Sequence, residues 1–240
     1  MSLDHTDANA YWPEKYRPKT VQDCILPDHL KDTFQAFVDK GEVPNMILSG
    51  RSGVGKTTVA IAVLEEIGID WLKINASIDL DKDALRTKIQ GFATTVSLVE
   101  SGRKMVLGDE FDGTSPEHVQ KPMRAFTEEF SHNCGFILTC NYLNKIIPAL
   151  QSRFSVVNFT ITKEEMPGLA AQFMTRACEI LDLEGITYDK KAVGALVARY
   201  MPDWRKVLNE LELYSANGEI DSGILVQVGT HEIGDLVGFI

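Results

Sequence analysis

Short apolar runs recur through the first two thirds of the chain, and segments with apolar residues at three- and four-residue spacing separate most of them. The runs predict buried strands, and the spacing predicts helices over residues 56–67, 83–99 and 117–130. Pro122 falls inside the third helix and should kink or shorten it. Apolar strands that alternate with helices indicate a parallel sheet covered on both faces. The five predicted strands are residues 46–49, 71–74, 104–107, 135–139 and 155–159.

Beyond residue 159 the pattern predicts helices only. Thr162 and Glu165 have the spacing of a capping box, which opens a helix running towards Leu183. Asp189 can cap a second helix, and Pro202 opens a third. The sequence therefore predicts an α/β domain over residues 1–160, a small all-helical domain over residues 161–228 and a tail over residues 229–240.

Composition and charge narrow the class of protein. The 240 residues suffice for one α/β domain with a satellite. No run approaches ~18 apolar residues, which argues against a membrane span, and the polar first ten residues argue against a secretory signal. The four cysteines lack CxxC spacing, which favours reduced thiols in a cytosolic protein, and the scattered histidines argue against structural zinc. The net charge of −10 means that any DNA surface is a local patch or is completed by other subunits.

A glycine-rich segment lies between the first predicted strand and the first predicted helix. It matches the phosphate-binding pattern GxxxxGK[ST] in the strand–turn–helix context that the pattern requires, which disfavours a chance glycine turn. Lys56 can place its charge on the β- and γ-phosphates of ATP, and the Thr57 hydroxyl can bind Mg²⁺. The motif is Gly50-Arg51-Ser52-Gly53-Val54-Gly55-Lys56-Thr57, and the predicted phosphate-binding residues are Gly53, Val54, Gly55, Lys56, Thr57 and Thr58.

Paired acids follow the third predicted strand. Charges at the end of a buried strand are unfavourable unless they face a metal or a cation. Asp109 fits a Mg²⁺ position, directly or through water, and Glu110 fits the base that orients the attacking water. A solvated acidic turn is the alternative, and the preceding P-loop disfavours it. Gly108 is unusual, because a larger apolar residue is expected to pack the strand there.

Three further polar residues are candidates for a role in phosphoryl transfer. Asn141 follows the fourth strand, at the end of the sheet where ligands of such folds bind, although a plain turn asparagine is the alternative. Arg153 precedes the fifth strand and Arg205 enters the third helix of the second domain. Each arginine alone would be a routine surface residue, but a guanidinium is what a transferring phosphoryl group requires.

Taken together, these motifs resemble the clamp-loader ATPase subunits of the AAA+ superfamily, in particular those of T-even-type bacteriophages. The resemblance covers nearly all of residues 10–228. It rests on Glu14-Lys15-Tyr16-Arg17-Pro18, Cys24-Ile25-Leu26-Pro27, the P-loop, Asp109-Glu110-Phe111-Asp112, Leu150-Gln151-Ser152-Arg153 and Pro202-Asp203-Trp204-Arg205-Lys206.

The resemblance implies a P-loop AAA+ core followed by a helical lid. It implies that Asn141 and Arg205 are nucleotide sensors and that Arg153 is an arginine finger acting on a neighbouring subunit's ATP. Because such fingers are worth ~10³ or more in rate, the lone chain is expected to hydrolyse ATP slowly. The implied pocket for adenine and ribose is formed by Pro13, Glu14, Lys15, Tyr16 and Ile25.

The implied partners are other subunits of a hetero-oligomeric ring, a sliding clamp and primer–template DNA, in the cytoplasm of a host if the protein is viral. The family's third domain, a helical collar, has no room here. Either the chain is a fragment, with residues 229–240 as the start of that domain, or its assembly depends on other partners. Phe154 replaces the cysteine that usually follows the arginine finger. Lys82, Arg86 and Lys88 lie in about the right region for template DNA, and a solvated helix face explains them equally well.

Two other functions stay open at this point. One is a scaffold that binds ATP without cleaving it, and Glu110 argues against it, since a non-hydrolysing subunit typically lacks that base. The other is a related AAA+ machine, such as a helicase loader or a branch-migration ATPase. The Lys15-Tyr16-Arg17-Pro18 segment argues against this second alternative.

Overall fold

The computed structural model describes residues 10–76, 82–95, 103–221 and 223. The chain divides into two compact units, one formed by residues 18–160 and the other by the segment from residue 161 onward together with residues 10–17. The sequence pattern predicts residues 1–17 within the first domain. The structure instead groups residues 10–17 with the second unit, because their hydrogen bonds run to residues of that unit.

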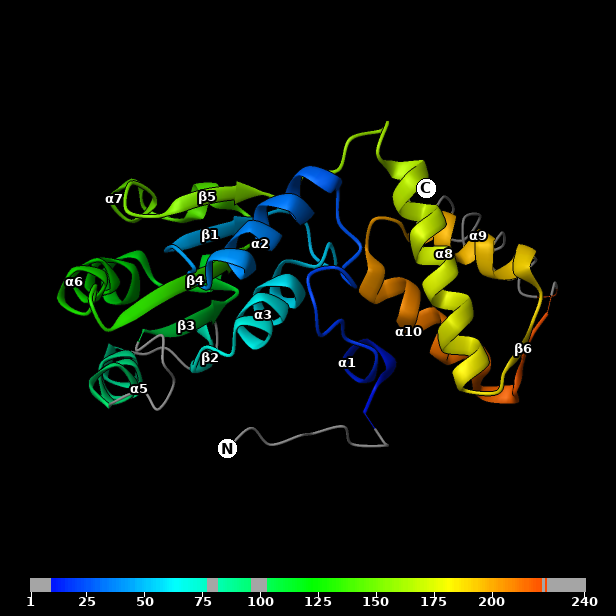
Figure 1. Ribbon diagram of the computed structural model, residues 1–240, viewed down its shortest axis with the longest axis horizontal. Coiled ribbons are helices and arrows are strands. Elements are labelled where there is room, and N and C mark those ends of the chain that lie inside the picture. The colour runs from blue at the N-terminus through cyan, green and yellow to red at the C-terminus, as the bar shows by residue number, and fades with distance from the viewer. Residues whose placement is uncertain (1–9, 77–81, 96–102, 222, 224–240) are drawn as a thin grey trace, which may run out of the picture. The chain divides into compact units, whose positions relative to one another are not determined.

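The first unit is built on a parallel sheet of five strands in the order β2-β3-β4-β1-β5 (Figure 1). All five strands were predicted by apolar runs, and β3 extends beyond its run to include Gly108 and Asp109. Their bounds are β1 Met46–Ser49, β2 Trp71–Asn75, β3 Lys104–Asp109, β4 Cys134–Cys140 and β5 Ser155–Asn158.

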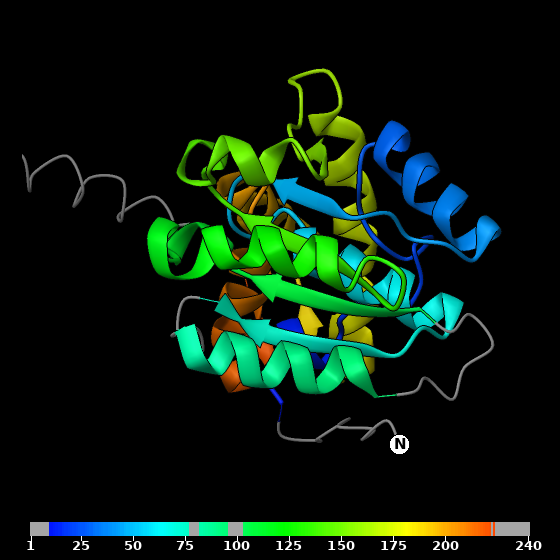
Figure 2. The ribbon, with the colours of Figure 1, turned by 90° about the vertical axis from the view of Figure 1, so that its left-hand side faces the viewer.

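Helices cover both faces of this sheet, as Figures 1 and 2 show. Alternate residues of a strand point to opposite faces, so Met46 and Leu48 join one apolar cluster while Ile47 joins the other. One cluster includes α2 and α3, and the other includes α5, α6 and α7. The helices are α2 Asp28–Lys40, α3 Lys56–Ile67, α5 Lys82–Thr94, α6 Lys121–Glu129 and α7 Pro148–Gln151.

The third predicted helix is not shortened at Pro122 but changes helix type just before it. The apolar spacing predicts one helix over residues 117–130, whereas the structure has a π-helix at Pro116–Gln120 followed by α6. Pro122 lies in the first turn of α6, where its missing N–H costs no intrahelical hydrogen bond. Short 3-10 turns at Phe111–Gly113 and Leu143–Lys145 follow β3 and β4.

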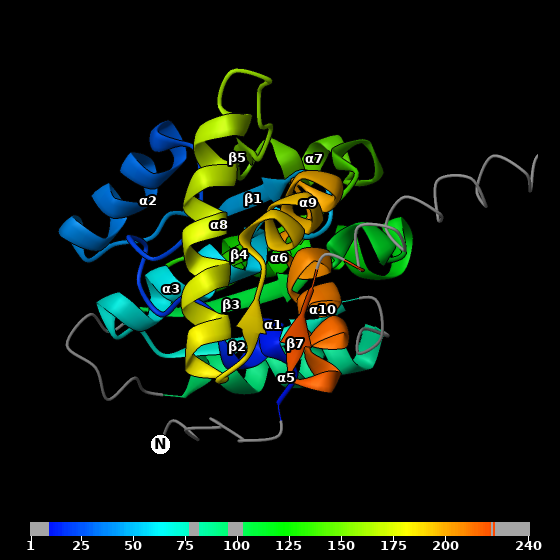
Figure 3. The same cartoon turned by 90° about the vertical axis from the view of Figure 1, so that its right-hand side faces the viewer.

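The second unit contains three longer helices, which are labelled in Figure 3. Asp189 and Asp203 cap the second and third of these through their side chains, and the stacked rings of Phe173 and Trp204 lie 4.7 Å apart in the core. The prediction of helices alone missed a short parallel pair of strands, β6 with β7. The elements are α1 Trp12–Lys15, α8 Met166–Leu183, β6 Thr187–Tyr188, α9 Lys190–Tyr200, α10 Trp204–Tyr214, a 3-10 turn at Ser215–Asn217 and β7 Glu219–Ile220.

Two regions named by the sequence fall outside the part of the chain that the structure describes. They are residues 96–99 of the second predicted helix and the tail over residues 229–240. Among the described residues, no helix combines the length and the apolar character needed to cross a bilayer.

Candidate nucleotide-binding site

Strand order brings the predicted chemistry together at one edge of the sheet. The P-loop leaves β1, the paired acids end β3, and Asn141 follows β4. These strands are neighbours in the order β3-β4-β1 and all run parallel, so their carboxyl ends meet at the same edge. That edge is where open α/β sheets bind their ligands.

The P-loop curls at the start of α3 because two of its glycines adopt left-handed backbone conformations. Gly53 has φ +76° and Gly55, directly before α3, has φ +95°. A residue with a Cβ disfavours this region, whereas glycine does not. Val54, which is 2% exposed, packs the loop into the core. The result is a turn whose following N–H groups open a helix, an arrangement suited to anions.

Lys56 is held inside this loop with its charge satisfied. Its side chain is buried, and Nζ donates hydrogen bonds to the carbonyl oxygens of Gly50 and Arg51, both at 2.7 Å. Nζ also donates to Asn141 Oδ1 at 3.0 Å. Burying an ammonium group requires such partners. The structure thus brings together Lys56 and Asn141, which lie 85 residues apart in the chain.

Asp109 joins the acid strand to the P-loop. Its Oδ1 accepts hydrogen bonds from Thr57 Oγ1 at 2.8 Å and from Thr139 Oγ1 at 2.6 Å, while Lys73 Nζ lies 3.2 Å from Oδ2. Burial on its own works to raise the pKa of Asp109, but the hydroxyl hydrogen bonds from Thr139 and Thr57, together with the Lys73 charge, bring that pKa below its ordinary value. Asp109 is therefore ionised at neutral pH.

Glu110 lies at a bend between β3 and the following 3-10 turn. Its φ of +54° is the only positive value among the described residues other than glycine. The backbone N–H of Glu110 donates to Thr139 Oγ1 at 3.1 Å, and its side chain is exposed. The Thr139 hydroxyl thus contacts both acids, accepting from the backbone of one and donating to the carboxylate of the other.

The structure explains why Gly108 stands where a larger apolar residue is expected. A Cβ at this position would lie 2.9 Å from Leu138 Cδ2 and 3.3 Å from Phe111 Cδ2. The space beside the strand is already filled by the ring of Phe111, which is buried. The expectation of a larger residue is therefore wrong for steric reasons.

Two polar residues of the site were missed by sequence reasoning. Thr139 lies within an apolar strand, two residues before Asn141, and is 1% exposed. Lys73 interrupts the apolar run of β2, and its ion pair with Asp109 gives that interruption a physical cause. In each case a polar residue in an otherwise apolar strand close to the ligand edge was the available signal.

Other predicted site residues belong mostly to the second unit. Residues 13–16 lie on or next to α1, where Tyr16 OH and Lys15 Nζ both contact Glu184 Oε1, and Arg205 is exposed in the first turn of α10. Both segments belong to the second unit, whereas Ile25 belongs to the first. The adenine pocket and the sensor role of Arg205 stay predictions.

Arg153 and the basic residues of α5 complete the predicted set. Arg153 contacts Glu128 and the carbonyl oxygen of Ala149 rather than the P-loop. Lys88 is exposed on α5. The side chains of Lys82 and Arg86 lie outside the described residues.

The donor set at the sheet edge fits a nucleotide with its magnesium ion. The Thr57 hydroxyl and the Asp109 carboxylate lie within hydrogen-bonding distance, and oxygen donors of this kind are those that Mg²⁺ prefers. Within the described residues, no cluster of three or more His, Cys, Asp or Glu side chains could hold a metal by itself. A Mg²⁺ ion here would depend on phosphate oxygens and water for its remaining ligands, as is usual for this ion.

Comparisons with known proteins agree with this geometry. Residues 46–160 match the family described as "ATPase family associated with various cellular activities (AAA)", and residues 166–226 match "Sliding-clamp-loader large subunit, AAA+ ATPase lid domain". The sliding-clamp-loader large subunit of Enterobacteria phage T4 is 40% identical over 215 residues, which are 88% of this chain and 67% of that protein. The replication factor C small subunit of Saccharolobus solfataricus is 36% identical over 87% of this chain and 63% of its own length.

The fold also resembles a solved structure of the Thermotoga maritima RuvB Holliday junction branch migration motor. The TM-score is 0.66 over 88% of this chain and 71% of that chain, with 16% sequence identity. At this identity the likeness concerns the fold alone. It is consistent with a helix-covered parallel sheet followed by a helical unit.

Proposed function

We propose that this chain, which belongs to the sliding-clamp-loader family of AAA+ ATPases, is an ATP-hydrolysing subunit of such a loader. It would act in a hetero-oligomeric ring in the host cytoplasm, open a sliding clamp and place it on primer–template DNA. ATP binding would assemble the active state, and hydrolysis would release the clamp. The proposal rests on the hydrogen bond that the hydroxyl of Thr57, next in sequence to the buried Lys56, donates to the Asp109 carboxylate.

The P-loop residues are proposed to bind the triphosphate. The N–H groups at the start of α3 and the Lys56 ammonium supply positive charge towards the phosphates. Thr57 and Asp109 would hold Mg²⁺, directly or through water. A bound Mg²⁺ neutralises charge on the phosphate oxygens. The lowered pKa of Asp109 keeps its carboxylate ionised for this task.

Water activation and nucleotide sensing are proposed for three other polar residues. Glu110 is proposed as the base that orients the attacking water. The hydrogen bond from its backbone N–H to the Thr139 hydroxyl helps to fix the position of its Cα, from which the exposed side chain extends. Asn141, already bonded to Lys56, can sense the γ-phosphate. Arg205 is proposed as the second sensor.

Arg153 is proposed to act on a neighbouring subunit's ATP. It lies two residues before β5, whereas the P-loop follows β1. These strands are parallel, with Met46 opposite Ser155 and Ser49 opposite Asn158. The amino end of β5 is therefore separated from the carboxyl end of β1 by three residue steps of ~3.3 Å each along the strands. Arg153 therefore lies beyond the amino end of the sheet, away from its own chain's P-loop. This placement favours action in trans.

Steady-state ATPase measurements on the assembled loader, with sliding clamp and primed DNA, test the proposal. Turnover should rise when clamp and DNA are added together. Tight ATP binding without any stimulated turnover would instead indicate a non-hydrolysing scaffold. Recovery of a helicase rather than a ring-shaped clamp in a pull-down would indicate a different AAA+ machine.

A further inference from the structure

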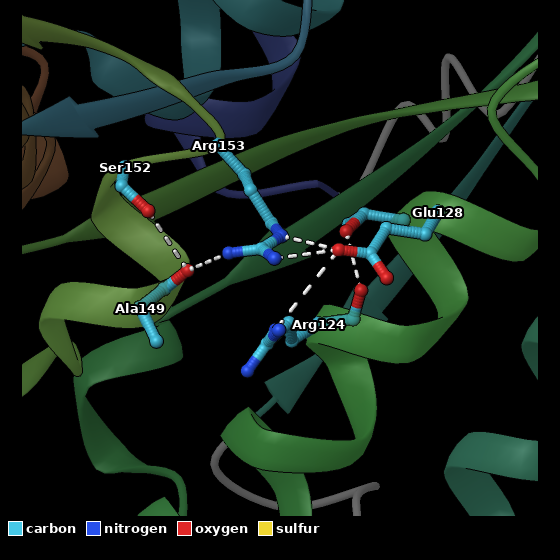
Figure 4. Close-up of polar contacts among 6 residues, drawn as sticks. Arg124, Glu128, Ala149, Ser152 and Arg153 are labelled. Atoms are coloured by element: carbon cyan, nitrogen blue, oxygen red, sulfur yellow. Dashed lines mark hydrogen bonds and ion pairs between the residues drawn. The ribbon is translucent and has the colours of Figure 1, made fainter.

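The guanidinium of Arg153 is fixed from two directions within its own chain (Figure 4). Nη1 donates to the carbonyl oxygen of Ala149 at 2.7 Å. This oxygen belongs to the short helix α7. The backbone N–H of Arg153 donates to a different carbonyl oxygen, that of Leu150. The Ala149 oxygen also accepts from Ser152 Oγ at 3.2 Å. The end of α7 thus provides one anchor for the arginine side chain.

Glu128, in the last turn of α6, provides the second anchor. Its Oε1 accepts from Arg153 Nε at 2.9 Å and from Nη2 at 2.5 Å. Arg124 approaches the same oxygen more distantly, with Nε at 4.0 Å. The hydrogen bonds from Arg153 hold the pKa of Glu128 below its ordinary value, so the pair is charged at neutral pH.

These hydrogen bonds use only some of the N–H groups of the Arg153 guanidinium. Nε and Nη2 form its lateral edge, and this edge faces Glu128. A guanidinium has five N–H bonds, and the contacts to Glu128 and Ala149 occupy three of them. Within the described part of the chain, one N–H on each terminal nitrogen has no partner. Those two can meet a phosphate oxygen while the anchors stay in place.

We propose that Glu128 is a positioning residue for Arg153: it holds the guanidinium by its lateral edge and presents the terminal N–H groups to the triphosphate of a neighbouring subunit. The inference rests on the proposed in-trans role of Arg153. An ordered guanidinium loses less side-chain freedom when it engages phosphate. The carboxylate acts here by geometry, so a neutral group with the same acceptor oxygen should replace it.

The opposite role, a carboxylate that withholds the finger, would act by charge. In that case glutamine would release the arginine as alanine does, and turnover would rise. Glu128 is 59% exposed and Arg153 is 27% exposed. Exposed pairs of this kind are too weak to withhold a guanidinium from a triphosphate. This weakness, together with the terminal N–H groups that the lateral contact leaves available, favours positioning over withholding.

The order of the Arg153 side chain can be measured on this chain alone. We expect ¹⁵N relaxation of the Arg153 Nε–H group to report a rigid side chain in the unaltered protein and in Glu128→Gln, and a mobile one in Glu128→Ala. Glu129→Ala is the matched control, since it removes the same charge from the next residue of α6 and should leave the order unchanged. Equal order in Glu128→Ala and in the unaltered protein would overturn the inference without involving any partner.

Turnover of the assembled loader with clamp and primed DNA provides the functional test. Glu128→Ala should lower kcat by about two- to tenfold, with KM for ATP little changed, because one side chain must be ordered at the moment of reaction. Glu128→Gln should restore most of the rate, and Glu128→Ala should have no further effect in an Arg153→Ala background.

The outcomes separate the inference from the proposed function. If Arg153→Ala leaves turnover unchanged, the finger assignment is wrong and the inference falls with it. If Arg153→Ala lowers turnover but Glu128→Ala does not, or raises it, only the positioning role is overturned. A loss in Glu128→Ala that glutamine does not restore also overturns it.

Discussion

Replacing Thr139 by valine tests the polar link between the two acids. The substitution keeps the side-chain shape but removes the hydroxyl, which donates to Asp109 and accepts from the Glu110 backbone. A hydrogen bond to a charged group contributes ~1.5–3 kcal/mol and a neutral one ~0.5–1.5 kcal/mol. The added methyl group returns up to ~0.8 kcal/mol through burial. We therefore expect Thr139→Val to destabilise the protein by ~1–4.5 kcal/mol.

Scanning calorimetry measures this loss as a shift in Tm. For a chain of this size ~1 kcal/mol corresponds to ~2–4 °C, so the expected decrease is ~2–18 °C. Thr127→Val is the matched control, because Thr127 is also buried but its hydroxyl, among the residues that the structure describes, bonds only to the Arg124 carbonyl of its own helix. That change should cost less than ~1 kcal/mol.

A functional loss should accompany the destabilisation. Without the Thr139 hydroxyl, the backbone N–H of Glu110 loses this hydrogen bond, which helps to fix the backbone that carries the proposed base. ATP turnover by the assembled loader should therefore fall further in Thr139→Val than in Thr127→Val. Equal Tm values for the two variants would refute the reasoning about the link.

Three other perturbations follow from the structure. Gly108→Val should lower stability by ~1–3 kcal/mol through overpacking, and an unchanged Tm would contradict the steric account. The folded-state pKa of Asp109 is lowered from 3.8, so its ionised carboxylate stabilises the fold above that value, and this stabilisation is lost as the pH falls through the folded pKa. Asp109→Asn should therefore make the free energy of unfolding less dependent on pH below about pH 4, measured by circular dichroism. Glu184→Ala removes the acceptor of Tyr16 and Lys15 and should speed hydrogen exchange in α1 by about two- to tenfold, whereas unchanged exchange would show that α1 is held by other contacts.

The sheet and the phosphate loop could be predicted because their signals are local. Four apolar residues before a glycine-rich turn identify β1, and the turn itself carries the residues that bind phosphate. The lysine and the asparagine that meet in the structure were each predicted from their position after a strand. Their contact required the strand order, which brings β4 beside β1.

The remaining features depended on contacts between distant segments. In the sequence, Thr139 is an ordinary β-branched residue of a strand. Its polar role is visible only in the structure, where its hydroxyl donates to Asp109. The N-terminal segment precedes the sheet in sequence, but Trp12 N donates to Glu212 and thereby joins the second unit. A local pattern cannot report a partner 200 residues away. Likewise, only the structure pairs Arg153 with Glu128.

Calorimetric titration of the chain with ATP and Mg²⁺ tests the central claim most directly. The unaltered protein should bind the nucleotide, and Lys56→Ala should weaken binding at least about tenfold, because a charged contact of ~1.5–3 kcal/mol to phosphate is lost. Lys40→Ala, at the exposed end of α2, should bind as the unaltered protein does. Affinity for ATP that is the same in Lys56→Ala and in Lys40→Ala would contradict the assignment of the phosphate site.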